Sequence, residues 1–155
     1  MSCTRATAIV LLSILSASLA SADDGSGEAL RADRQRIQGR WQVVELTVDG
    51  RTTPAEDVRK LMVVNGVDGS WRLLSDGSEI SRGESTFDPA AGPKTIDFTP
   101  TAGAGSGERY EGIYELDDTT RRLCFSTAGQ QRPMKFASEP GSQQILVRFE
   151  RIAEQ

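Results

Sequence analysis

Few residues in this chain could do chemistry, because its 155 residues include no histidine. That rules out Ser-His and Cys-His nucleophile pairs and zinc sites of the usual type. Glu45, Asp97 and Glu115 fall on predicted strands, and two carboxylates that face each other in a cavity could do acid–base work. Carboxylates on strands more often face solvent. We therefore expect a protein that is not an enzyme, with no catalytic residue, metal or cofactor.

The charge pattern and the loops also exclude some partners. The 18 basic and 22 acidic residues are interspersed, and no basic run is dense enough to follow a phosphate backbone. We expect no nucleic-acid partner. Asp117 and Asp118 stand in a predicted hairpin turn, where turn geometry favours aspartate and calcium binding is the weaker reading. The segment "GAGSG" from Gly103 lacks the Lys and Ser/Thr of a phosphate-binding loop.

The N-terminus has the pattern of a secretory signal peptide over residues 1–22. Arg5 supplies a positive charge, "AIVLLSIL" from Ala8 is apolar, and small residues follow through Ala22. This apolar run is too short to anchor the chain across a bilayer, so we expect no transmembrane segment after cleavage. Cleavage fits best after Ala22, with Ala20 as the alternative. We expect an exported protein, periplasmic or extracellular.

Removal of the signal peptide, which contains Cys3, leaves Cys124 as the single cysteine of the mature chain. An unpaired cysteine in an exported protein suggests a free thiol or an intermolecular disulfide. Cys124 lies between Leu123 and Phe125 in an apolar strand, where cysteine behaves as a small buried hydrophobe. A reactive thiolate would need a nearby cation, and Arg122 shares its strand face only if the strand is regular. A structural core role is the favoured interpretation.

Two short helical segments are expected near the start of the mature chain. Residues 23–28 read as a flexible acidic tail, and "ALRADRQRIQG" from Ala29 predicts a short helix that ends at Gly39. The tail and helical lead-in together cover residues 23–35, ahead of one domain over residues 36–155. A second helix is predicted after Thr53 as N-cap, with Pro54 in its first turn and Glu56 completing a capping box.

The remaining sequence alternates at strand period between closely spaced turns. The candidate strands are Trp41–Val48, Leu61–Val64, Ser70–Leu74, Ile80–Phe87, Thr95–Thr99, Arg109–Leu116, Arg122–Ser126, Met134–Ala137 and Gln144–Arg151. Their connections are too short for parallel crossovers, so neighbouring strands must pair antiparallel. The pattern predicts an all-β fold, an up-and-down barrel of about eight strands that removes exposed edges by closing on itself.

Several segments resemble a lipocalin-like domain family of unknown function that is abundant in planctomycete bacteria. The resemblance covers about residues 36–151 and begins with "GRW" at Gly39, which is similar to the G-x-W signature of lipocalin-type barrels. The matching segments are "IQGRWQVVELTVDGR", "FDPAAGPKTIDFTP", "GIYELDDTTRRLCFS" and "RPMKFASEPGSQQILVRFER". The resemblance implies a small lipocalin-like barrel but brings no established activity, ligand or catalytic residue. It also implies a cysteine in the "LCF" strand, in keeping with a core role for Cys124.

The resemblance further implies a structural role for Gly39 and Trp41 at one end of the barrel. In lipocalins the first-strand Trp packs beneath an Arg from the last strand, and both Arg148 and Arg151 are candidates here. Strand alternation places Trp41, Val43 and Glu45 on one face of the first strand. If Trp41 points inward, these three side chains line the interior and are the predicted ligand-binding residues.

Two functions from different classes follow from these expectations. The favoured one is an exported, non-enzymatic binding protein that takes a small apolar or amphipathic ligand into its barrel, and it requires an open cavity. The alternative is a filled barrel that acts through its outer surface as an envelope-associated interaction module. A cavity of about 300 Å³ or more would favour the first and a packed interior the second.

Overall fold

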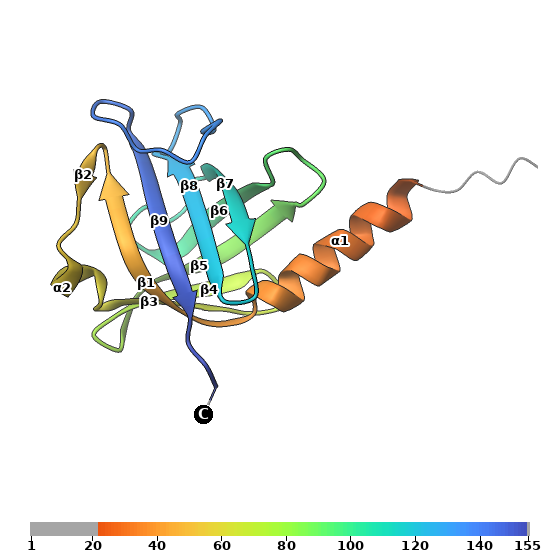
Figure 1. Ribbon diagram of the computed structural model, residues 1–155, viewed down its shortest axis with the longest axis horizontal. Coiled ribbons are helices and arrows are strands. Elements are labelled where there is room, and N and C mark those ends of the chain that lie inside the picture. Colours follow the sequence, from red (N-terminus) through yellow and green to blue (C-terminus); the bar gives the residue numbers. More distant parts are fainter. Residues whose placement is uncertain (1–21, 155) are drawn as a thin grey trace, which may run out of the picture.

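The computed structural model describes residues 22–154, which form one closed β-barrel with two helices (Figure 1). The predicted signal peptide lies outside the described residues except for Ala22. Cys3 and the alternative cleavage site after Ala20 also lie outside them.

The strands of the described chain agree closely with the segments that alternation predicts. Their bounds are β1 Gly39–Val48, β2 Arg51–Thr52, β3 Leu61–Asn65, β4 Ser70–Ser75, β5 Ser78–Asp88, β6 Thr95–Gly103, β7 Tyr110–Leu116, β8 Thr120–Ser126 and β9 Gln144–Arg151. Two-residue turns join some of the consecutive strands. Between β4 and β5, Asp76 and Gly77 have φ angles of 50° and 79°, as the tight turns favoured in hairpins require.

Within the described residues the strands form a single antiparallel sheet in the order β2-β1-β3-β4-β5-β6-β7-β8-β9. The sheet closes because β1 also pairs with β9, from Trp41 opposite Arg151 to Val48 opposite Ile145. The two-residue β2 pairs only with Thr47 and Val48 at the end of β1. The other eight strands make the barrel wall. The predicted all-β, up-and-down barrel is confirmed.

One predicted strand is wrong. Residues 134–137 contain no strand and belong to the long connection between β8 and β9. This connection folds over the outer face of the barrel, where Arg132 Nη1 donates to the carbonyl oxygens of Ile96 and Gly112 at 3.2 and 2.7 Å. Phe136 and Ala137 of this connection pack on the outer face of β8, against Arg122 and Cys124, whereas Met134 is 89% exposed.

Both helices differ from their predictions. The first, α1 (Ala22–Ile37), includes the acidic segment 23–28 that was expected to be a flexible tail. The second, α2 (Ala55–Val58), has only four residues, and Pro54 is its N-cap with no side-chain capping bond, so the predicted Thr53 capping box is wrong. The helix is followed closely by β3, which begins at Leu61 as expected.

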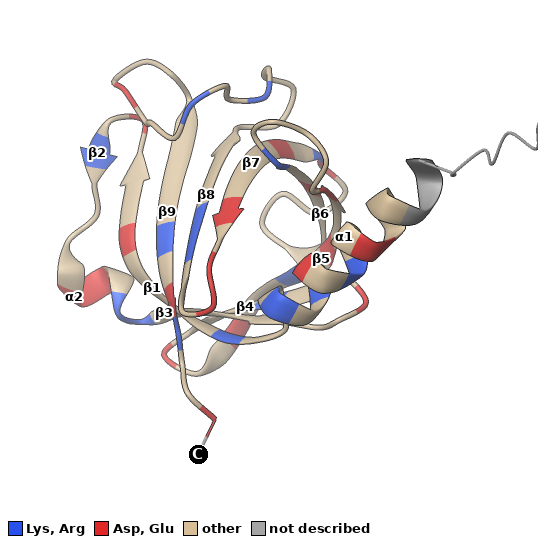
Figure 2. Cartoon of the chain, turned by 45° about the vertical axis from the view of Figure 1, so that its right-hand side comes forward, with Lys and Arg blue, Asp and Glu red and all other residues tan. Residues whose placement is uncertain are grey.

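The C-terminal part of α1, from Asp33 onward, is fixed against one end of the barrel, and the N-terminal part of the helix extends away from it (Figures 1 and 2). Trp41 Nε1 donates to the carbonyl oxygen of Ile37 at 2.7 Å. Arg151 donates to the carbonyl oxygens of Arg36 and Gln38, the latter at 2.8 Å. These bonds satisfy carbonyl groups that a helix C-terminus otherwise leaves unpaired.

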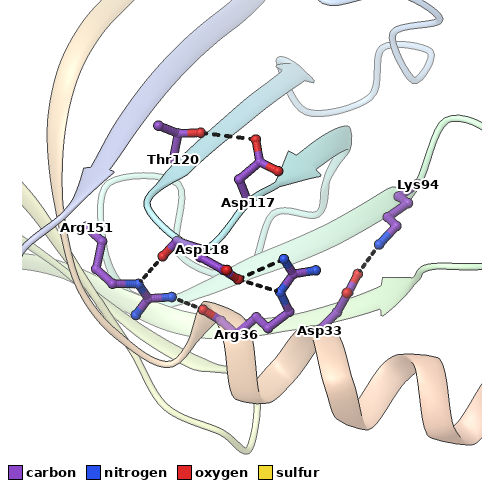
Figure 3. Close-up of polar contacts among 7 residues, drawn as sticks. All are labelled: Asp33, Arg36, Lys94, Asp117, Asp118, Thr120 and Arg151. Carbon is purple, nitrogen blue, oxygen red and sulfur yellow. Dashed lines mark hydrogen bonds and ion pairs between the residues drawn. The ribbon is translucent and has the colours of Figure 1, made fainter.

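The β7–β8 turn completes this attachment (Figure 3). Arg36 Nη2 contacts Asp118 Oδ1 at 2.9 Å, and Arg151 Nε donates to the Asp118 carbonyl oxygen at 2.7 Å. Helix α1, β9 and the β7–β8 turn are thus joined at a single point. We call this end of the barrel the α1 end.

Candidate functional site

Strand β1 points two of its three predicted ligand-binding residues toward the barrel interior, and one of them, Val43, lines the cavity there. Trp41 and Val43 point inward, but the pairing with β9 shifts register between Val43 and Glu45. This β-bulge reverses the alternation, so Leu46 lines the interior and Glu45 lies outside, where Arg148 Nη2 contacts its Oε1 at 2.6 Å. The expectation that Glu45 faces the interior is therefore wrong.

The barrel interior holds a cavity of about 230 Å³. Its wall is largely apolar and includes side chains from β3, β4, β6, β8 and β9, among them Val63, Leu73, Phe98, Leu123, Phe125 and Ile145. Val43 also lines it. Trp41 does not line it and is fully buried beyond it at the α1 end.

The two ends of this cavity differ in exposure. At the α1 end the lining residues Ile37, Tyr114 and Phe149 are buried. Leu46 and Ile145, near the opposite ends of their strands, are partly exposed. Ile37 of α1 thus closes one end of the cavity, and partly exposed lining side chains lie at the opposite end, where β2 and the β8–β9 connection are found (Figure 1).

Arg121 is the one charged side chain among the described residues that line the cavity. It is 6% exposed, and its guanidinium carbon lies 4.1 Å from the Phe149 ring centre and 5.2 Å from that of Trp41. Its Nε is buried without a hydrogen-bond partner, and no ion pair joins its guanidinium to a carboxylate of the described residues. Burial, and secondarily the charge of Arg151, lower the pKa of Arg121 to about 9, which leaves the guanidinium charged at pH 7.

Two other polar groups of the cavity wall lack partners within residues 22–154. These are the side-chain nitrogens Asn65 Nδ2 and Trp71 Nε1. Asn65 and Trp71 pair with each other across β3 and β4, and Asn65 also pairs with Gly39 of β1. Both nitrogens, like those of Arg121, are hydrogen-bond donors.

Tyr114 closes the α1 end of the cavity together with a buried carboxylate. Its hydroxyl donates to Asp33 Oδ2 at 2.7 Å, and Lys94 Nζ contacts the same oxygen at 2.7 Å. Figure 3 shows the Asp33–Lys94 contact between α1 and the barrel. Burial, followed by the bond to Asp33, raises the pKa of Tyr114 well above its usual value. The Asp33 carboxylate is paired with Lys94 and Tyr114, and it does not serve as the counter-ion of Arg121.

Of the two candidate arginines, Arg148 and Arg151, it is Arg151 that packs on Trp41. Its guanidinium carbon is 4.2 Å from the Trp41 ring centre, whereas Arg148 lies outside with Glu45 and Glu150. Gly39 adopts a φ of 112°, and a Cβ there would lie 3.3 Å from Arg151 Nη1. Glycine therefore suits this position both for its backbone and for the space that Arg151 needs.

Cys124 is fully buried, but on the outer side of β8 rather than in the cavity. The β8–β9 connection covers it, and its thiol lies 3.3 Å from the Ala137 carbonyl oxygen. Burial raises the pKa of the Cys124 thiol, against a smaller opposite effect of Arg122. These features fit the expected structural role better than a reactive thiol.

The other predicted carboxylates do not meet in the cavity. Asp97 pairs with Arg109 at 2.5 Å and with Arg132 at 2.7 Å, and Glu115 pairs with Arg122 at 2.7 Å. No cluster of three His, Cys, Asp or Glu side chains suited to a metal ion occurs in the described part of the chain. Of its two helices, neither is long and apolar enough to span a membrane.

Sequence reasoning missed the polar residues of the cavity, above all Arg121. A signal for it existed, since Arg121, Leu123 and Phe125 alternate in one strand and so share a face. The predicted strand began one residue later, at Arg122, and left Arg121 out. Comparison of the chain with protein-family models, curated proteins and solved structures finds no match.

Proposed function

We propose that this chain is an exported, non-enzymatic binding protein of the lipocalin-like family, which takes a small apolar or amphipathic molecule into its barrel. The cavity carries this proposal. It combines an apolar wall with an end closed by α1 and with partly exposed lining side chains at the opposite end, an arrangement that suits a ligand lying lengthwise.

The size of the cavity restricts the ligand. At about 230 Å³ it falls short of the roughly 300 Å³ named above as favouring a binding protein, the size at which drug-sized ligand sites begin, but the interior is not packed solid either. One water occupies about 30 Å³ of liquid, so the cavity has room for about eight groups of that size. The proposal therefore concerns a small molecule and not a long-chain lipid held entirely inside.

Thermal shift and native mass spectrometry test the proposal directly. The probes are hexanol, octanol, octanoate and geraniol, added to the purified mature chain. A ligand at 100 times its dissociation constant stabilises the folded state by about 2.7 kcal/mol, which shifts the melting temperature by several degrees. Native mass spectrometry of freshly purified protein should show an adduct of matching mass.

A matched pair of variants shows whether binding occurs in the cavity. Val63 lines the cavity, whereas Val64 pairs with the exposed Arg40 and Arg72 on the outer face of the same strand. Val63→Phe should abolish the shift and Val64→Phe should leave it unchanged. If no probe shifts the melt and no adduct is seen, the filled-barrel interaction module becomes the better proposal.

A further inference from the structure

Arg121 places a positive charge inside an apolar cavity without a counter-ion from the described chain. Removing a charge from water costs several kcal/mol unless another group compensates for it. The rings of Phe149 and Trp41 offset part of this cost by cation–π attraction. The charge of Arg151, which lowers the pKa of Arg121, has the same sign and so adds to this cost. The free protein therefore leaves this charge largely unbalanced.

The unpaired polar groups around the cavity share one property. Arg121 Nε, Asn65 Nδ2 and Trp71 Nε1 are all donors, and the described cavity wall includes no carboxylate. Such a wall favours a ligand group that accepts hydrogen bonds and carries negative charge. A neutral hydrocarbon would satisfy none of these donors.

Resting on the proposed function above, we infer that the ligand is a small anionic amphiphile, a monocarboxylate with an apolar tail of about six to eight carbons. Its carboxylate pairs with Arg121 at the α1 end. Its tail lies among apolar side chains such as Leu123, Phe125 and Ile145, toward the end opposite α1.

A carboxylate fits this site better than a phosphate. The planar guanidinium matches a carboxylate in two parallel hydrogen bonds. A phosphate dianion would need a second cation, and Arg151 already donates to the carbonyl oxygens of Arg36, Gln38 and Asp118. A single free guanidinium therefore matches a single negative charge.

This inference gives Arg121 opposite effects on folding and on binding. Replacing an unpaired buried charge by an apolar side chain of similar length often stabilises a fold. Arg121→Met should therefore melt at a higher temperature than the unaltered protein, yet bind the carboxylate more weakly. A residue that only supports the structure would not separate the two effects in this way.

The experiment compares octanoate with octanol by isothermal titration calorimetry on the full mature chain. Octanoate should bind about 10- to 150-fold more tightly, the ratio that one hydrogen-bonded charge pair provides. Arg121→Met should remove this preference, and Arg121→Lys should keep part of it. Arg122→Met is the matched control, because Arg122 lies outside, on the Phe136 ring and 2.7 Å from Glu115. It should retain the full preference.

The outcomes separate this inference from the proposed function. Equal binding of octanol and octanoate, or a preference that survives in Arg121→Met, would overturn the anionic ligand while leaving a cavity binder in place. Binding of neither probe, nor of hexanol or geraniol, would overturn the proposed function itself. If Arg121→Met does not fold, two measurements still test the inference. They are the ratio of octanoate to octanol affinity in the unaltered protein and the reduction of that ratio in Arg121→Lys.

Discussion

Replacement of Trp41 tests whether this side chain holds α1 against the barrel. Its ring is fully buried, Arg151 packs on it at 4.2 Å, and its Nε1 donates to Ile37 at 2.7 Å. Trp41→Ala should lower the free energy of unfolding by about 3–5 kcal/mol, the range for deleting a large buried aromatic. For a chain of this size that corresponds to a fall of roughly 6–20 °C in melting temperature.

Trp41→Phe separates the hydrogen bond from the packing. It keeps an aromatic ring but leaves the Ile37 carbonyl oxygen without its donor, which costs about 1–3 kcal/mol. Trp71→Phe is the matched control, since Trp71 Nε1 has no partner within residues 22–154 and so no bond is lost. Trp41→Phe should therefore be the more destabilising variant by about 1–3 kcal/mol.

Urea unfolding followed by far-UV circular dichroism measures both variants. The midpoint should move while the slope stays constant, because the surface exposed on unfolding hardly changes. Equal costs for Trp41→Phe and Trp71→Phe would refute a stabilising bond to Ile37. A loss below about 1 kcal/mol for Trp41→Ala would contradict the buried packing as well.

Three further predictions concern reactivity, pH and processing. Cys124 should react slowly with a thiol reagent in the native state and quickly in denaturant, because it is buried and its pKa is raised; fast native labelling would restore the reactive-thiol interpretation. The pKa of Tyr114 is higher in the folded than in the unfolded chain, so stability should fall as pH rises above about 10. The difference in unfolding free energy between the unaltered protein and Tyr114→Phe, measured from pH 8 to 11, isolates this effect, and a constant difference would argue against it. The intact mass of the exported protein should correspond to a chain that begins at Asp23 or Ser21, and an unprocessed mass in the membrane fraction would contradict export.

The strands could be predicted from the sequence because alternation and turn residues are local signals. Residues 134–137 misled the prediction because Met134, Lys135 and Phe136 alternate between apolar and charged as a strand does, although Met134 is exposed in a loop. The length of α1 was also missed. Its acidic first part has little apolar surface, and tertiary contacts such as Arg36 with Asp118 fix its last turn.

The candidate site was harder to predict, because it depends on two non-local features. Alternation from Trp41 places Glu45 inside, and only the pairing of β1 with β9 reveals the bulge that turns Glu45 outward. Arg121 lies next to Arg122 and has the same side chain. Which of the two arginines pairs with a carboxylate depends on the neighbouring strand, because Glu115 of β7 lies opposite Arg122 of β8.

The pairing of β1 with β9 also has a consequence for how the chain folds. Arg151 and Gln38, which are joined by a hydrogen bond, are 113 residues apart in the chain. Contacts of such long range slow folding, which for β-rich domains takes about milliseconds to seconds. Until β9 is in place, β1 and β8 each present an unpaired edge. The interval before the last strand docks is therefore when one copy is most prone to pair with another.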